Sequence, residues 1–268
     1  MNYREKRLMI HQKLEIMKKC YQECDVNNFD LFYDTFFDRN RLPIIIGTDN
    51  GAWFHTMGQI RWLIHYDWQK WGRVEIDTWN FTIYESESHD LVRTRGVLDF
   101  QQDRVWDLDI IMIFSKEEFR RDEFGGPGGV NRTGKDYRCR LMQFKVPRNE
   151  IRPVVILNKS KEEQTKSEKE MLDLKRLNGD VRSDLMREHL AGRVVSMLRE
   201  QRPYLDNLDV REEMIYMEEN DEGFLFALTG FCVHTELNAL LPFRIVGIGQ
   251  GYEILDSEFS HPFVSTLG

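Results

Sequence analysis

The sequence contains few cysteines, and they do not form the pattern of a disulfide framework. Its 268 residues include only four, Cys20, Cys24, Cys139 and Cys232. Cys20 and Cys24 lie four positions apart on a predicted helix and would share one face, but no nearby His or Cys pair completes a metal site around them. We therefore expect buried thiols, no bound metal and the reducing environment of the cytoplasm.

The chain also lacks long apolar runs and an excess of basic residues. No stretch approaches the roughly 20 apolar residues that a membrane-spanning helix needs. The charged N-terminal segment has no apolar region typical of a signal peptide. The formal net charge is −8, which would repel a phosphate backbone. These absences predict a cytoplasmic protein that binds neither nucleic acid nor a membrane.

A glycine-rich segment, residues 125–129, lacks the features of a phosphate-binding loop. No Gly-Lys-Ser/Thr sequence follows it, and no predicted strand leads directly into a helix there. We interpret residues 115–135 as an inserted loop instead. The sequence predicts no cofactor.

The chain contains enough apolar residues to form a hydrophobic core, since 41% of its residues are hydrophobic and 12% are aromatic. Apolar side chains recur at helical spacing over residues 3–24, 29–37, 57–68 and 184–199. Alternating or β-branched segments predict strands over residues 41–46, 74–84, 91–100, 105–114, 137–146, 151–157, 210–217, 224–234, 243–248 and 252–259. Helices followed by antiparallel strands indicate an α+β fold.

One order of elements occurs twice along the chain. Residues 59–100 read as an amphipathic helix, a strand, a turn and a second strand that contains Gly96. Residues 189–234 repeat this order, with Gly230 in the matching place, which predicts a duplicated unit. We predict a first domain at 1–158, a linker or exposed helix at 159–183 and a related second unit at 184–268. A competing register pairs residues 43–46 with 153–156 and would start the second unit earlier.

The first half resembles the cone fold of nuclear transport factor 2, ketosteroid isomerase, scytalone dehydratase and the SnoaL-like cyclases. The resemblance rests on Ile44-Ile45-Ile46-Gly47-Thr48-Asp49-Asn50-Gly51-Ala52-Trp53-Phe54, on Gly58-Gln59-Ile60 and on the strand pair that holds Arg95-Gly96-Val97-Leu98. It implies a curved antiparallel sheet roofed by the N-terminal helices, with an apolar interior suited to a small ligand. The second unit lacks a counterpart of the paired roof helices in its sequence. It is therefore expected to be either a partial unit or one that relies on the first unit for its roof.

Within such a fold, the candidate site lies around residues 47–66. Asp49 and His55 are candidates for a catalytic base, because enzymes of this fold use an Asp or His in the cavity. Trp53, His65 and Tyr66 are candidate ligand-binding residues, since an aromatic wall with an imidazole can stack a planar ligand and move a proton. The alternative interpretation is that Trp53 belongs to the core, Asp49 caps a turn and His55 is exposed.

Arg93, Arg95 and Asp99 alternate on one face of a predicted strand. If that face is concave, Arg93 would bind an anionic group and Asp99 would serve as a base. If it is convex, the three form a solvated ladder. The sequence thus leaves two functions open: a small-molecule-binding protein, in the form of a cofactor-independent isomerase, dehydratase or cyclase, and a non-catalytic scaffold that forms homodimers through its sheets. The expected ligand is small and apolar or aromatic.

Overall fold

The computed structural model shows two α+β units, each with its own sheet. It describes residues 2–39, 41–47, 52–71, 73–100, 104–116, 137–145, 155–156, 184–201, 208–220, 223–234, 239–250 and 253–260. The chain divides into one unit of Met1–Ile46 with Phe54–Met142 and another of Gly47–Trp53 with Gln143–Gly268. Residues 48–51, most of the predicted loop at 115–135 and the predicted linker at 159–183 lie outside the described residues.

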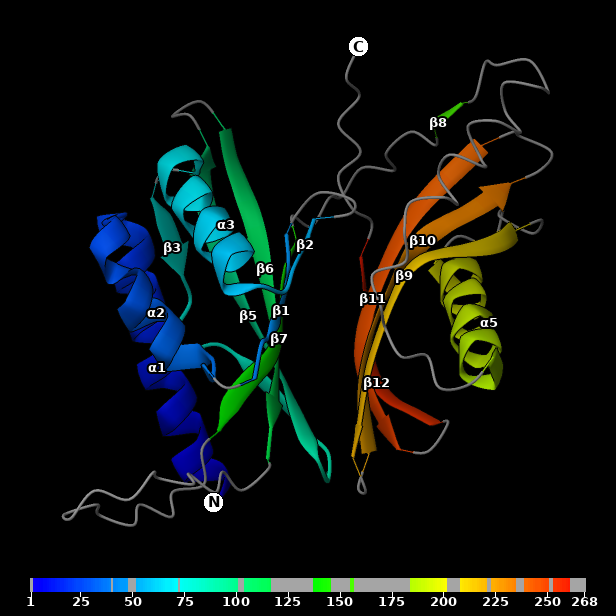
Figure 1. Ribbon diagram of the computed structural model, residues 1–268, viewed down its shortest axis with the longest axis horizontal. Coiled ribbons are helices and arrows are strands. Elements are labelled where there is room, and N and C mark those ends of the chain that lie inside the picture. The colour runs from blue at the N-terminus through cyan, green and yellow to red at the C-terminus, as the bar shows by residue number, and fades with distance from the viewer. Residues whose placement is uncertain are drawn as a thin grey trace. The chain divides into compact units, whose positions relative to one another are not determined.

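Three helices lie on one face of the first sheet, as Figure 1 shows. They are α1 (Tyr3–Glu23), α2 (Phe29–Phe36), which follows a short 3-10 turn η1 (Val26–Asn28), and α3 (Met57–Lys70). A capping box fixes the start of α1 at Asn2, and another fixes the start of α3 at Thr56. Each helix buries one apolar stripe, so the helix-covered side of the sheet forms the core of the unit.

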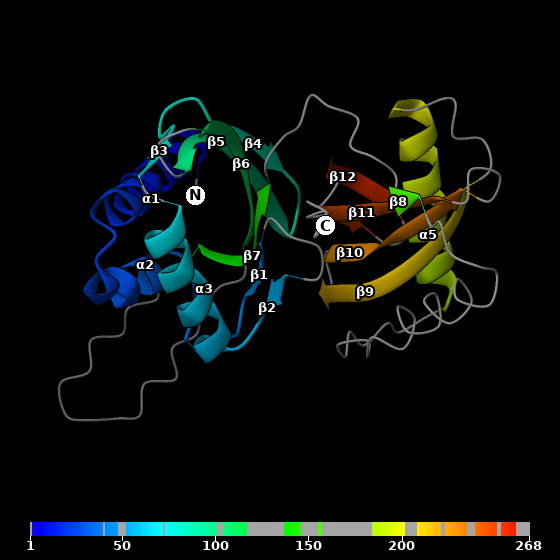
Figure 2. The same ribbon diagram turned by 90° about the horizontal axis from the view of Figure 1, so that it is seen from above.

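The first sheet has seven strands in the order β2-β1-β7-β6-β5-β3, with β4 also paired to β5. Its strands are β1 (Ile44–Ile46), β2 (Trp53–Phe54), β3 (Val74–Ile76), β4 (Thr82–Glu85), β5 (His89–Phe100), β6 (Arg104–Ser115) and β7 (Arg138–Lys145). Figure 2 shows the sheet bending around the three helices. The element order and this curved sheet confirm the predicted α+β cone-like fold.

The two faces of β5 differ in burial. Val92, Thr94, Gly96 and Leu98 are buried, whereas Arg95 and Val97 on the other face are exposed. Gly96 lies on the buried face, where an added Cβ would be 3.1 Å from the Glu75 carbonyl oxygen. Glycine at this position therefore allows β3 to approach β5 closely.

The predicted strand over residues 74–84 is interrupted in the structure. Asp77 accepts hydrogen bonds through Oδ1 from the backbone N–H groups of Trp79 (3.0 Å) and Asn80 (2.8 Å). This side-chain-to-backbone turn competes with the sheet ladder and separates β3 from β4. Both strands still pair antiparallel with β5, so the interruption adds a kink rather than a new partner.

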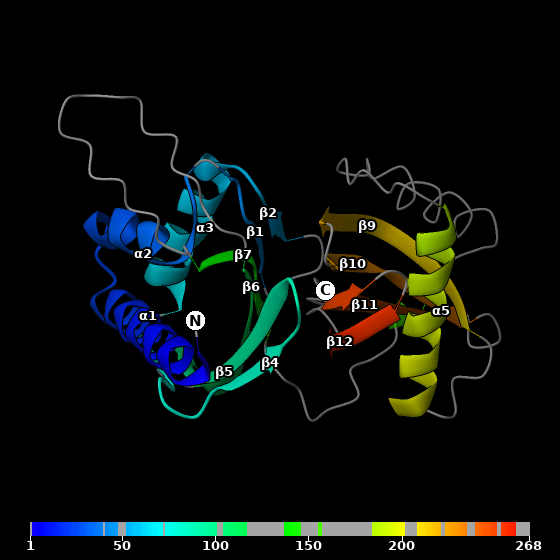
Figure 3. The ribbon, with the colours of Figure 1, turned by 90° about the horizontal axis from the view of Figure 1, so that it is seen from below.

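The second unit contains helix α5 (Asp184–Gln201) and a five-stranded sheet. The strands β9 (Leu208–Asn220), β10 (Gly223–His234), β11 (Ala239–Gln250) and β12 (Glu253–Ser260) follow the order β12-β11-β10-β9, and β8 (Val155–Ile156) pairs with β11. Figure 3 shows α5 lying along this sheet. The pairing of β8 places residues 155–156 in the second sheet, although the predicted boundary at 158 grouped them with the first.

Gly96 and Gly230 occupy comparable places in their sheets. Gly96 pairs with Ile76, the last residue before the interruption between β3 and β4. Gly230 pairs with Glu212 at a register shift between β9 and β10. In each sheet a glycine therefore marks the point where the neighbouring strand departs from regular pairing. The duplication itself stays a prediction.

Among the described residues, no helix is long and apolar enough to cross a membrane.

Candidate functional site

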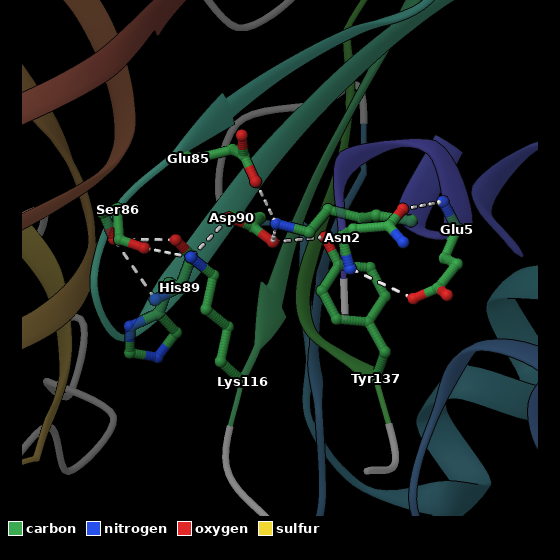
Figure 4. Close-up of polar contacts among 9 residues, drawn as sticks. Asn2, Glu5, Glu85, Ser86, His89, Asp90, Lys116 and Tyr137 are labelled. Atoms are coloured by element: carbon green, nitrogen blue, oxygen red, sulfur yellow. Dashed lines mark hydrogen bonds and ion pairs between the residues drawn. The ribbon is translucent and has the colours of Figure 1, made fainter. Parts of the chain in front are cut away.

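The most heavily buried charged cluster of the first unit is centred on Asp90, the second residue of β5. Its side chain has no exposed surface. The Lys6 ammonium lies 2.7 Å from Oδ2, and the Tyr137 hydroxyl donates to the same oxygen at 2.8 Å. The Lys116 ammonium lies 3.0 Å from Oδ1 (Figure 4). Three donors from distant parts of the sequence thus meet one carboxylate.

Each partner of Asp90 stands at the end of an element. The capping box of Asn2 and Glu5 starts α1 and places Lys6 in its first turn, where Lys6 also pairs with Glu85 at the end of β4. Lys116 directly follows β6, and Tyr137 directly precedes β7 and stacks on Phe114 with ring centroids 4.6 Å apart. The cluster therefore joins α1 to four neighbouring strand ends.

The pKa shifts in this cluster describe a stable ionic network. Burial and the adjacent Asp90 charge raise the pKa of the Tyr137 phenol, so it stays a hydrogen-bond donor. Burial opposes the charge on Lys6, but hydrogen bonds to Asp90 and Glu85 outweigh it and raise its pKa. A carboxylate that is fully buried and held by three donors is poorly placed to take a proton from an incoming molecule. The geometry suits a structural clamp.

A second polar group lies among the apolar side chains between α3 and its neighbours. The buried stripe of α3 consists of Ile60, Leu63, Ile64, Asp67 and Trp68. Asp67 is only 2% exposed. Its charge, after burial itself, is the largest cause of the raised pKa of the buried Tyr21 phenol on α1. A carboxylate and a phenol are therefore electrostatically coupled inside this unit.

Aromatic rings surround this part of α3. Trp68 lies 6.0 Å from Tyr21 and 6.4 Å from Phe32, measured between ring centroids, with both pairs close to perpendicular. His65 lies 6.2 Å from Trp68 and 5.7 Å from Phe29. Edge-to-face contacts of this kind are favourable packing arrangements for aromatic rings.

Some buried polar atoms in the first unit have no hydrogen-bond partner among the described residues. They include the Tyr33 hydroxyl, His65 Nε2 and Trp68 Nε1. His65 and Trp68 are three positions apart on α3, so their rings lie on neighbouring parts of the helix surface. Buried polar atoms are nearly always paired in native proteins, so an unpaired one calls for a partner such as water or a ligand.

The predicted site residues near α3 are not all brought together. Asp49 lies outside the described residues. His55 is half-buried just before α3, and its backbone N–H donates to Gln59 Oε1 at 3.2 Å. Trp53 is 7% exposed on β2, and Tyr66 is 44% exposed. Of the described members of this group, His65 is half-buried, and its ring contacts those of Phe29 and Trp68.

Arg93 faces away from the helices. The preceding residue, Val92, is buried on the same face of β5 as Asp90, and Arg93 lies on the opposite face. There, Arg93 Nη2 pairs with Asp109 Oδ2 at 2.7 Å, and Arg95 Nε lies 3.8 Å from the same carboxylate. Arg93 and Arg95 thus share the buried carboxylate of Asp109, and the anion-binding role of Arg93 stays a prediction. The side chain of Asp99 lies outside the described residues.

Sequence reasoning missed Asp67 and Trp68 as site candidates, although a signal for both was present. Positions 60, 63, 64, 67 and 68 follow helical spacing, so Asp67 is the acidic residue within an apolar stripe.

Among the described residues, no group of three or more His, Cys, Asp or Glu side chains could hold a metal ion.

Comparisons with known proteins found similarity at the level of the fold. No protein-family model matches the sequence, and no curated protein is similar to it in sequence. A protein of unknown function with a cystatin-like fold from Nostoc punctiforme is 12% identical, with a TM-score of 0.39; the match covers 56% of this chain and 97% of that one. Nuclear transport factor 2-like proteins of unknown function from Pseudomonas putida and Shewanella oneidensis are 8% and 14% identical.

The match to the Pseudomonas protein has a TM-score of 0.38 and covers 56% of this chain and 94% of that one. The match to the Shewanella protein has a TM-score of 0.33 and covers 51% and 96%. Each match therefore spans about half of this chain and nearly all of a single-unit structure. At TM-scores below 0.5 these likenesses carry no argument about function, and the cone-like fold rests on the element order and the sheet described above.

Proposed function

We propose that the first unit binds a small, largely apolar aromatic molecule between its helices and its sheet. The observation that carries the proposal is the pair of unpaired polar atoms, His65 Nε2 and Trp68 Nε1, that is buried among aromatic rings. Leaving a buried donor or acceptor unsatisfied costs about 1–3 kcal/mol. A ligand that supplies the missing hydrogen bonds recovers this cost and gains apolar contact with the rings.

The proposed chemistry is proton transfer without a cofactor, as in an isomerase, dehydratase or cyclase. The imidazole of His65 supports it, because imidazole is a common general acid or base in proton transfer. Asp67, on the same buried stripe of α3 as Trp68, adds a carboxylate close by. The catalytic roles of Asp49 and His55 stay predictions.

A non-catalytic scaffold is the second candidate function, and two observations favour it. Aromatic rings on α2 and at its C-terminal end contact one another and fill part of the interior. The ring centroids of Phe32 and Phe36 are 5.4 Å apart, and those of Tyr33 and Phe37 are 5.3 Å apart. In addition, Trp62 is 60% exposed and stacks on Tyr66 at 5.3 Å. An exposed aromatic pair suits a protein–protein contact, including one between two copies of this chain.

A thermal-shift screen separates the two functions. We expect hydroxy-aromatic, steroid-like or polyketide-like compounds to raise the Tm, because a ligand at 100 times its Kd stabilises a protein by about 2.7 kcal/mol. His65→Phe should abolish the shift, and Tyr66→Phe, on the exposed side of the same helix, should retain it. If no compound raises the Tm, and sedimentation shows a dimer that Trp62→Gln dissociates, the scaffold function replaces the binding function.

A further inference from the structure

We infer that the first unit pairs with a second copy of this chain through the exposed face of α3, with the two helices antiparallel. The inference rests on the scaffold function, the second candidate above, and names its partner and register. This face consists of Phe54, Gly58, Trp62, Tyr66 and Lys70, of which the last four recur every fourth residue along α3. These four residues are exposed, and Phe54, just before the helix, is half-buried.

The three aromatic rings of this face form one continuous stack. The ring centroid of Trp62 lies 6.1 Å from that of Phe54 and 5.3 Å from that of Tyr66, at interplanar angles of 28° and 18°. Because each ring is held by its neighbour, little side-chain freedom remains to be lost when another surface covers the stack. Trp and Tyr side chains are also the residues that most often anchor protein–protein contacts.

The helix surface is open at Gly58. A Cβ added there would meet no atom within 4 Å, so nothing in the described part of the chain requires a residue as small as glycine. Gly58 and Tyr66 each lie four positions from Trp62, on opposite sides. A two-fold axis at Trp62 therefore places the Tyr66 ring of each copy over the other copy's open position and brings the two Trp62 rings together. Such self-complementarity is what a contact between two identical surfaces requires.

Charge favours the antiparallel register. The only acidic residue of α3, Asp67, is buried, and the exposed Arg61 pairs with Asp30 of α2 at 3.4 Å. Two copies that each carry a net charge of −8 repel one another least where neither presents a carboxylate. With a rise of 1.5 Å per residue, the antiparallel register separates the two Lys70 residues by about 24 Å. Each then points toward the Phe54 ring of the other copy, an attractive arrangement for a cation.

Sedimentation equilibrium of the whole protein over a wide range of concentrations tests the pairing. We expect a dimer whose Kd is raised about thirtyfold or more by Trp62→Gln, which removes the central anchor. Trp79→Gln is the matched control, because Trp79 is 68% exposed on the connection between β3 and β4. This variant should leave the Kd unchanged.

Gly58→Leu separates pairing from folding. The added side chain has open space in a single copy and suits a helix, so the Tm should not fall at concentrations where the protein is monomeric. In the dimer the same side chain occupies the place of the other copy's Tyr66 ring, so the Kd should rise at least about tenfold.

Cysteine cross-linking reports the register. A mixture of Gly58→Cys and Tyr66→Cys chains should form a covalent dimer on oxidation that neither variant forms alone, because position 58 of one copy faces position 66 of the other. A parallel pair would instead cross-link each variant with itself, which would overturn the antiparallel register.

The outcomes separate this inference from the functions proposed above. A protein that stays monomeric, or a dimer that Trp62→Gln does not weaken, overturns the pairing through α3. A dimer that Trp62→Gln dissociates and Gly58→Leu leaves intact retains the scaffold function and overturns the pairing of Tyr66 with position 58. The ligand-binding function is decided by the thermal shifts alone, so either result leaves it unchanged.

Discussion

A single carboxylate can organise a large part of a small domain when its partners come from different elements. Asp90 does so in the first unit, since it binds Lys6 of α1, Lys116 after β6 and Tyr137 before β7. Removing water from these charges is costly, and only the complete set of partners offsets it. The residue therefore matters through the geometry that it holds, and its loss should be felt in stability rather than in binding.

Asp90→Asn should lower the free energy of unfolding by about 3 kcal/mol, because it leaves the buried Lys6 ammonium without its main counter-charge. Urea denaturation followed by circular dichroism measures the change. Glu75→Gln is a suitable control: Glu75 pairs with Lys18 at 3.2 Å on the surface, where an ion pair contributes less than about 1 kcal/mol. Equal losses in the two variants would show that the Asp90 network is no more than a surface pair.

At the scale of elements, the close approach of β3 to β5 involves one position of β5. Gly96 lies against β3 on one side and Leu108 of β6 on the other, and β4 pairs with the same strand beyond the Asp77 turn. The close approach leaves little room for a side chain on this face. A glycine in the middle of a strand is normally unfavourable, so its presence here reflects the packing of the neighbouring strand.

Gly96→Val should destabilise the first unit by about 1–3 kcal/mol, since its Cβ alone would lie 3.1 Å from the Glu75 oxygen and 3.5 Å from Val74 Cγ1. Val97→Thr, at the next position and on the exposed face, should change stability by no more than about 0.5 kcal/mol. Chemical denaturation of both variants makes the comparison. A fully stable Gly96→Val variant would mean that the sheet does not need a close approach at this point.

At the scale of the whole molecule, the chain divides into two compact units and contains two sheets, and strands of both sheets carry buried apolar side chains. Among the described residues, the thiols and phenols whose pKa is clearly raised all lie in the first unit. Burial raises the pKa of the Cys20 thiol to about 11 and that of Cys139 to about 12, and it raises the pKa of the Tyr21 and Tyr137 phenols. In the unfolded chain these groups lose their protons near their ordinary pKa values.

We therefore expect two thermal transitions, of which the first unit's is the more sensitive to alkali. A thiol whose pKa is higher in the folded protein than in the unfolded chain stabilises the fold as long as it stays protonated in both states. This stability is complete below the pKa of the unfolded thiol, about 9, and is lost as the pH rises above it. At pH 10.5 the loss is about 2 kcal/mol for each buried thiol. Scanning calorimetry between pH 8 and 10.5 measures it, with Phe32→Ala and Phe226→Ala marking the two transitions. A single transition with one common pH dependence would contradict the expectation.

The sequence by itself determined where the helices and strands lie, because apolar periodicity is a local property. The predicted helix at 57–68 and strands at 91–100 and 105–114 match α3, β5 and β6 within about two residues. It also indicated the cone-like fold through the order of these elements. The sequence also suggested His65 as a ligand-binding residue, because it is an imidazole within an aromatic segment, and this role stays a prediction.

The tertiary structure alone decided which faces these elements cover. Asp90 and Arg93 are three positions apart on one strand, so their side chains lie on opposite faces of the sheet. Because the helices pack on the face of Asp90, Arg93 lies on the face without helices. The partners of Asp90 come from residues 6, 116 and 137, and no local pattern relates them. Periodicity fixes which residues share a face, but only the packing of distant elements determines which face becomes the interior.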